Sequence, residues 1–286
     1  WMLAQSFTLR VGSAWQQAAV RVLPPVTAAT AALTAALLGA SVGWSGPTLV
    51  LSALLGYAVG AAWLLPALRV HTGGTANTIE KSDKPQQSDP RSATLRMAHT
   101  LVDALLATAI IMVWQRLYGA EETGWMSALL RVLGLLPALV HMAWAQVALA
   151  EGRTADTPHT YTTSPWWLGL TAFAAVIVLG LSCAVALHQE WLDPRWSGVW
   201  AYIAPLVLWQ GSACLSAAFS HRPFQTQSAT AYSWACIALS TTQTIALLAP
   251  IGLTLKIDPL QHITAFTFIS SLGLLAMSFW ASKLRN

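Results

Sequence analysis

The sequence predicts an all-α fold: a polytopic integral membrane bundle of about eight transmembrane helices, with an N-terminal interfacial amphipathic helix. Composition is the first observation behind this prediction. Hydrophobic residues make up 55% of the 286 residues and charged residues only 9%, whereas roughly a quarter of the residues of a soluble domain are charged. The second observation is that apolar residues gather in segments of about twenty residues or more, enough to cross a hydrocarbon core of roughly 30 Å.

The distribution of basic residues is the third observation, and it predicts the orientation. When eight spans are counted, eleven of the fifteen Lys and Arg residues fall on the side of the N-terminus. They are Arg10, Arg21, Arg69, Lys81, Lys84, Arg91, Arg96, Arg153, Arg222, Lys283 and Arg285. Cytosolic loops carry the excess of Lys and Arg in membrane proteins. Both termini are therefore expected in the cytosol, in a multi-pass protein of an endomembrane such as the endoplasmic reticulum, with the organelle left open.

Residues 1–23 are expected to form the interfacial amphipathic helix. Apolar residues recur at steps of three and four, at Leu3, Phe7, Val11, Ala14, Ala18 and Val22, while Arg10 lies off this stripe. A helix with this pattern lies in the plane of the membrane surface with its apolar stripe buried. An acid-poor targeting segment is the alternative, because the first acidic residue of the chain is Glu80.

Residues 24–286 are expected to form a single transmembrane helical domain. Its first two spans are predicted over about 25–44 and 47–69, joined by a tight turn. Each contains two glycines four residues apart, a spacing that lets helix backbones approach closely in lipid, so the two spans should pack as a hairpin. The polar segment at about 71–95 has no apolar period and is predicted to be a flexible cytosolic loop.

Six further spans are predicted from the remaining apolar segments. They cover about 97–118, 125–150, 165–187, 198–220, 231–255 and 260–282. Tryptophan residues lie at or near many of their ends, which is typical of an interfacial aromatic belt. The acidic residues of the short non-cytosolic loops, Glu122 and Asp193 among them, are expected to be solvated. The three cysteines are expected to be small buried hydrophobic residues.

Asp103 is the one acidic residue within a predicted span. A carboxylate at such a depth costs on the order of 2.5 kcal/mol or more, so it usually faces a partner or a wet cavity. His99 lies one helical turn earlier on the same face. If the third and fourth spans form a hairpin, His141 and Gln146 can meet these two residues in the cytosolic half of the bundle.

Three interpretations of this group stay open. These residues can hold the helices together through interhelical hydrogen bonds, or they can form the proton or ion relay of a transporter. They can also form an acid/base site, with Asp103 as the catalytic acid and His99 or His141 as the partner that shares its proton. A metal site is not expected, because no metal-ligand spacing occurs here.

A second polar patch is predicted near the middle of the membrane and assigned to substrate binding together with Gln146. The members assigned to substrate binding come from the sixth and seventh spans: Trp209, Gln210, Thr241, Thr242, Gln243 and Thr244. Ser240 of the seventh span and Ser270 and Ser271 of the eighth belong to the same patch, which together with Asp103 can line a polar pocket within the bundle. The alternative is that these hydroxyl groups only bond their own backbone four residues earlier in the helix.

These observations favour a membrane-embedded enzyme that performs acid/base chemistry, such as terpenoid- or sterol-like cyclisation or isomerisation, on a lipophilic small molecule. In size and helix count the chain is similar to small membrane cyclases and isomerases of terpenoid and sterol metabolism. Those enzymes would use two buried carboxylates, and this chain offers only Asp103. The chain has no nucleotide-binding or aspartate-rich magnesium motif, and no cofactor is expected.

Two alternative functions remain: a small proton- or cation-coupled transporter, and a structural subunit of a membrane complex. The expected partners are membrane lipid and a lipophilic substrate, with a homo-oligomer or a larger membrane complex left open. Nucleic acid is not an expected partner, because the formal charge of +4 is the ordinary excess of cytosol-facing cations in a membrane protein.

Overall fold

The computed structural model describes residues 90–144, 164–226, 228–254 and 256–284, together with residues 23–24, 26–31, 34, 51–52, 54–56, 58–60 and 62. The chain divides into two compact units. One comprises residues 1–86 and 142–159, and the other comprises residues 87–141 and 160–286. Residues 1–22 of the predicted interfacial helix, residues 71–89 of the predicted loop and Gln146 lie outside the described residues.

Helices account for most of the described residues, and no strand occurs among them. The elements are α4 (Pro90–Leu133), α5 (Leu135–Leu139), the π-helix η1 (Val140–Trp144), α7 (Pro165–His188), the 3-10 helix η2 (Pro194–Val199), α8 (Trp200–Phe219), α9 (Arg222–Gln225), α10 (Ala229–Gly252) and α11 (Pro259–Lys283). The all-α fold class is therefore confirmed for the described part of the chain.

Five described helices are long and apolar enough to cross a membrane, which indicates a multi-pass membrane protein. They cover Met97–Trp144, Pro165–His188, Pro194–Gln225, Ala229–Gly252 and Pro259–Lys283. Large apolar side chains such as Leu101, Val178 and Phe279 are exposed on their outer faces. Apolar surface of this extent on several helices suits contact with lipid and not with water.

The third and fourth predicted spans are not separated by a loop. Helix α4 begins at Pro90, within the predicted loop, and continues to Leu133, with a single break at Gly119. Gly119 has φ 88° and ψ −178°, a backbone conformation that L side chains rarely adopt. One glycine therefore redirects the chain between two helical segments, so no separate loop is needed.

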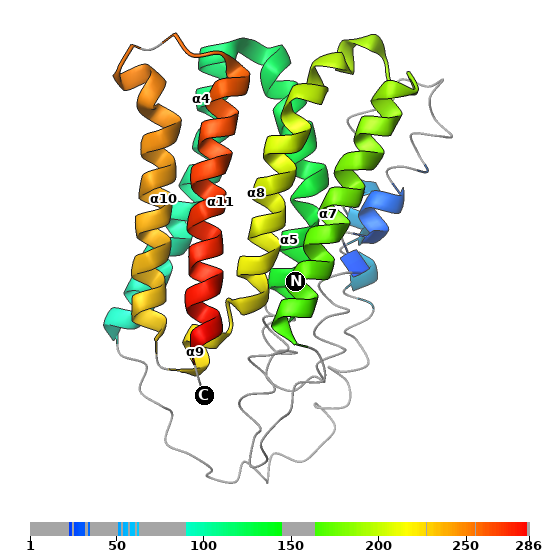
Figure 1. Cartoon of the computed structure of the whole chain (residues 1–286). Helices are drawn as coiled ribbons and strands as arrows, with labels where there is room; N and C mark the ends of the chain where they lie inside the picture. The colour runs from blue at the N-terminus through cyan, green and yellow to red at the C-terminus, as the bar shows by residue number, and fades with distance from the viewer. Residues whose placement is uncertain are drawn as a thin grey trace. The chain divides into compact units, whose positions relative to one another are not determined.

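Helix α8 is the central element of the larger unit. It packs against α7 on one side and α11 on the other, and also contacts α4 and α5 (Figure 1). Trp114 of α4, Tyr202 and Leu206 of α8, and Phe266 of α11 are almost fully buried where these helices meet. The core of this unit thus lies around α8.

Glycines allow α7 and α8 to approach closely. A Cβ atom at Gly169 would lie 2.9 Å from Leu215 Cδ2 and 3.2 Å from Leu215 Cα. At Gly180 the same atom would lie 2.4 Å from Val207 Cγ2. Close packing of small residues provides the van der Waals contact that holds helices together in lipid, where no hydrophobic force between them is available.

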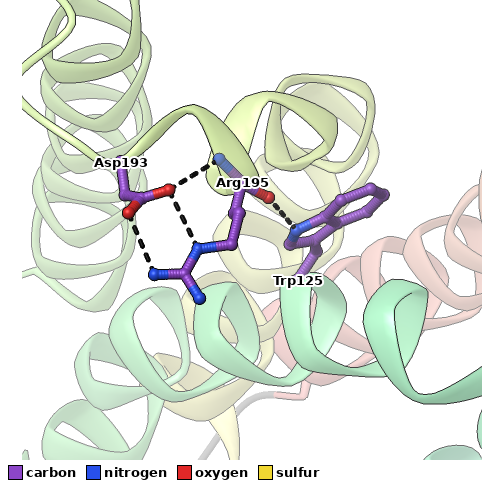
Figure 2. Close-up of polar contacts among 3 residues, drawn as sticks. All are labelled: Trp125, Asp193 and Arg195. Carbon is purple, nitrogen blue, oxygen red and sulfur yellow. Dashed lines mark hydrogen bonds and ion pairs between the residues drawn. The ribbon is translucent and has the colours of Figure 1, made fainter.

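The connection between α7 and α8 is held by the hydrogen bonds drawn in Figure 2. The Asp193 carboxylate accepts from the Arg195 backbone N–H and guanidinium, each at 3.0 Å, and caps η2. These hydrogen bonds from Arg195 lower the pKa of Asp193. Trp125 Nε1 of α4 donates to the Arg195 carbonyl at 2.8 Å, so this loop is tied to the start of the second half of α4.

The smaller unit contains the described residues of the first two predicted spans. A Cβ atom at Gly56 would lie 2.4 Å from the Pro24 carbonyl oxygen and 2.9 Å from Ala28 Cβ. The close approach of these two segments at a glycine, predicted from the spacing of small residues, is confirmed at Gly56.

We expect Gly169→Ala to lower the free energy of unfolding by about 1–3 kcal/mol, because the added methyl group forces α7 and α8 apart. Gly124→Ala is the matched control, since a Cβ atom there meets nothing within 4 Å. Thermal unfolding in detergent measures both variants. Equal melting temperatures for the two would show that contact at Gly169 does not limit the stability of the bundle.

Candidate functional site

A cavity of about 270 Å³ lies between α4, α8, α10 and α11. Its polar lining residues are Asp103, Ser216, Tyr232, Ser240 and Gln243, together with Cys236 and Trp209. The remaining lining residues are apolar: Leu106, Ala107, Ile110, Ala213, Leu239, Leu274 and Met277. A mostly apolar cavity with a few convergent polar groups is typical of a small-molecule site.

Asp103 is bound by α10. The Ser240 hydroxyl donates to Asp103 Oδ1 at 2.5 Å, and Tyr232 and Cys236 interact electrostatically with the carboxylate. These three α10 residues are spaced four apart, so they share one face of that helix. The sequence predicted that residues of the fourth span would meet Asp103; the observed partners come from α10 instead.

His99 lies on the same side of α4 as Asp103 and contacts Tyr232. The two rings meet edge to face, with centroids 6.4 Å apart. The Nδ1 atom of His99 is buried and has no hydrogen-bond partner among the described residues. Tyr232 therefore contacts His99 and also interacts with Asp103, so it links the two α4 residues that the sequence singled out.

His141 occupies a different position from the one predicted. It belongs to η1 and does not line the cavity, and its Nδ1 atom lies 3.3 Å from the Ser220 hydroxyl next to the end of α8. The π-helix shifts the register at this point, so spacing along an ideal α-helix does not give the direction of its side chains.

The second predicted patch divides in two. Trp209 and Gln243 line the Asp103 cavity, whereas Gln210 is buried with its Oε1 atom directed toward Gly134. The hydroxyls of Thr241, Thr242 and Thr244 donate to their own backbone carbonyls four residues earlier, at 2.7, 2.9 and 2.7 Å. For these threonines the alternative of internal backbone bonding is the one observed.

The chemistry available at the cavity is that of a carboxyl group beside hydroxyls and aromatic rings. No Lys, Arg or His side chain in the described part of the chain forms an ion pair with Asp103. No group of three His, Cys, Asp or Glu residues among the described residues is placed to hold a metal ion. The arrangement can exchange a proton at Asp103, accept hydrogen bonds and present the Trp209 and Tyr232 rings.

A second polar network lies near the Gly119 break, and the sequence did not predict it. Trp114 Nε1 donates to the Tyr202 hydroxyl at 3.3 Å, and that hydroxyl donates to Glu122 Oε2. Trp114 stacks on the His262 ring at a centroid distance of 4.8 Å. Glu122, expected to be a solvated loop residue, is thus bound to a nearly fully buried tyrosine.

The hydrogen bonds of His262 determine its tautomer. Its Nε2 atom lies 3.3 Å from the Ala246 carbonyl, which can only accept, so the ring proton is on Nε2. Nδ1 then accepts from the Tyr118 hydroxyl, 3.0 Å away. The four-residue spacing of Trp114 and Tyr118 is the signal that could have indicated their shared face in the sequence, whereas Glu122 lies beyond the break at Gly119, so helical spacing does not place it.

Comparison of the chain with protein-family models, with curated proteins and with solved structures finds no match.

Ser240→Ala should destabilise the protein by about 0.5–2 kcal/mol, because it removes an interhelical hydrogen bond to a carboxylate. Thr241→Val, which removes a hydroxyl bonded only to its own helix, should change stability by less than about 0.5 kcal/mol. A thermal-unfolding double-mutant cycle with Asp103→Asn measures the coupling. Strictly additive effects of Ser240→Ala and Asp103→Asn would contradict a direct contact.

Tyr202→Phe should lower the free energy of unfolding by about 1–3 kcal/mol, since the buried Trp114 N–H loses its acceptor. Tyr232→Phe removes a phenol hydroxyl from the other polar group and serves as the comparison. The near-ultraviolet circular dichroism of the tryptophans, followed with temperature, gives the melting temperature and reports the loss of fixed packing around Trp114. An unchanged melting temperature for Tyr202→Phe would show that the network contributes nothing to stability.

Proposed function

We propose that this chain is a membrane-embedded enzyme that performs acid/base chemistry on a lipophilic small molecule bound in the Asp103 cavity. The observation that carries the proposal is the position of Asp103, whose carboxylate lies in the wall of a mostly apolar cavity between four helices. An apolar lining favours an apolar ligand, and a single carboxyl group can give and retrieve a proton.

The reaction that suits one carboxyl group is an isomerisation or a cyclisation. The Asp103 carboxylate removes a proton from one atom of the substrate, and the resulting carboxylic acid returns a proton to another atom. The substrate is rearranged and Asp103 is restored, so no co-reactant is consumed. Ser240 orients the carboxyl group through its hydrogen bond, and Trp209 and Gln243 contact the substrate.

His99 acts on Asp103 through Tyr232 in this proposal, because Tyr232 contacts the His99 ring and lines the cavity. His141 is given no catalytic part in this proposal, because it does not line the cavity. The threonines at positions 241, 242 and 244 stabilise α10 only.

We further propose the complete topology expected from the sequence. Eight spans behind an interfacial helix result from one crossing on each side of Gly119, one each from α7, α8, α10 and α11, and one each from residues 25–44 and 47–69. The bias of basic residues favours both termini on the cytosolic side of an endomembrane. A lipophilic substrate can then enter from the bilayer.

A small proton- or cation-coupled transporter is the second candidate. Pro205 lies inside α8, Pro250 lies inside α10, and η1 is a π-helix. Interruptions of this kind are used as bending points when transporters alternate between states. Uptake of the bound molecule into proteoliposomes, absent from an enzyme that releases a rearranged product, distinguishes the two functions.

Asp103→Asn tests the proposal directly. The purified variant should fold, with a melting temperature within a few degrees of the wild type, but should fail to convert a pool of lipophilic molecules extracted from membranes. Mass spectrometry of the pool before and after incubation would show wild-type conversion as a change of retention time without a change of mass.

The exposed Asp193→Asn variant, which makes the same chemical change outside the bundle, should convert the pool as the wild type does. Conversion by Asp103→Asn at the wild-type rate would reject the enzymatic role of the carboxyl group. Failure of Asp103→Asn to fold, with Ser240→Ala showing wild-type conversion, would assign Asp103 to helix packing.

A further inference from the structure

We propose that the ligand of the Asp103 cavity is a lipophilic amine in its protonated form, bound with its ammonium group at Asp103 and its hydrocarbon body against the apolar wall. This inference rests on the proposed function, because it names the class of molecule that occupies the same cavity. Four features of the cavity support it: the unpaired charge, the hydrogen-bonding groups, the aromatic rings and the apolar wall.

The first feature is the charge of Asp103. Its one hydrogen-bond donor in the described structure is the Ser240 hydroxyl, and it forms no ion pair with a described basic side chain. An ionised carboxylate within a bilayer is stabilised by a charged or polar partner, and the described helices, which leave Asp103 exposed, supply it with a single neutral hydroxyl. The cavity beside the carboxylate leaves room for a cationic group of a ligand.

The second feature is the set of polar and titratable groups that each neighbouring helix presents to the cavity. Besides Asp103, α10 contributes Tyr232, Cys236, Ser240 and Gln243, and α8 contributes Ser216 and Trp209. Helix α11 contributes only Leu274 and Met277, and α4 adds His99 behind Tyr232. Hydroxyl and amide oxygens can accept hydrogen bonds from an ammonium group. No lining residue is a Lys or Arg that would repel it.

The third feature is aromatic. Trp209 and Tyr232 line the cavity from two different helices, together with Asp103. The faces of aromatic rings attract cations, and tryptophan does so most strongly. A carboxylate and two aromatic residues around one apolar cavity therefore favour an amine over a neutral alcohol of the same length.

The fourth feature is the apolar wall. Leu106 and Ile110 of α4, with Leu274 and Met277 of α11, line the remainder of the cavity. Its volume of about 270 Å³ is near the lower end of the range of small-molecule sites, roughly 300–1,000 Å³. The ligand is therefore a small amphiphile with one charged group.

Binding of two probes to the purified full chain in nanodiscs tests the inference. N,N-dimethyldecylamine is the amine, and 1-decanol is the neutral molecule with the same hydrocarbon chain. We expect the amine to bind the wild type at least tenfold more tightly than the alcohol at neutral pH, after subtraction of partitioning into empty nanodiscs. Asp103→Asn should remove this preference, whereas Asp193→Asn should retain it.

Two further variants keep the test decisive if Asp103→Asn does not fold. Trp209→Leu should weaken the binding of the amine about threefold or more relative to the binding of the alcohol, because it removes the aromatic face. Ala213→Phe fills the cavity and should weaken the binding of both probes at least tenfold.

The outcomes separate the ligand class from the cavity itself. Equal affinities for the two probes, with both lost in Ala213→Phe, would overturn the amine class and leave the cavity as a site for neutral lipophiles. Wild-type binding of both probes by Ala213→Phe would show that neither occupies the cavity, and would overturn the proposed function as well. An amine preference that persists in both Asp103→Asn and Trp209→Leu would also overturn the inference.

Discussion

The bundle depends on the close packing of α8 with its neighbours, and this packing is possible because the contact surfaces are made of small residues. Glycines of α7 face α8, while serines and a threonine lie buried on α8 and α11. The hydroxyls of Ser212, Thr267 and Ser270 donate to their own backbone carbonyls at 2.7–2.8 Å. A hydroxyl bonded within its own helix needs no partner across the interface, so these residues pack like alanine or glycine.

Polar side chains that cannot form hydrogen bonds within their own helix need partners on another helix. This requirement explains the contacts of Asp103 and Glu122 in the larger unit. A carboxylate has no donor with which to bond its own backbone carbonyls. Asp103 therefore binds Ser240 of α10, and Glu122 binds Tyr202 of α8. Every polar group needs a hydrogen-bond partner. The threonines of α10 find theirs in their own backbone, whereas each of the two carboxylates finds its partner on another helix and so connects two helices.

Sequence analysis predicted the fold class because the relevant signal, long apolar segments with few charges, is a property of each segment alone. The third span was predicted to end at about 118, next to the break at Gly119, but the continuation of the helix without a loop could not be derived, because only the backbone angles of Gly119 reveal it. The helix neighbours of Asp103 could not be derived either. Hairpin connectivity favoured the next span, but packing in lipid depends on which faces carry small residues, and α10 supplies the partners.

Individual site residues were predictable to different degrees. Asp103 stood out because a carboxylate in an apolar span is rare, and it does line a cavity. The threonines at positions 241, 242 and 244 were selected for their polarity, which says nothing of whether a hydroxyl is already bonded internally. Tyr232 and Cys236 were overlooked because tyrosine and cysteine are ordinary in a span, and only their four-residue spacing from Ser240 sets them apart.

An apolar layer separates the two polar groups of the bundle. Ile110 lies one turn before Trp114, and Leu247 lies one turn after Gln243, so both fall between the Asp103 cavity and the Tyr202 network along their helices. Together with Leu206 they belong to one buried cluster of apolar side chains. Proton transfer needs a hydrogen-bonded path, and none between the two groups runs through the described residues. The described hydrogen bonds therefore do not connect Asp103 with Glu122, and Asp103 is the one carboxylate among the described residues that line the cavity.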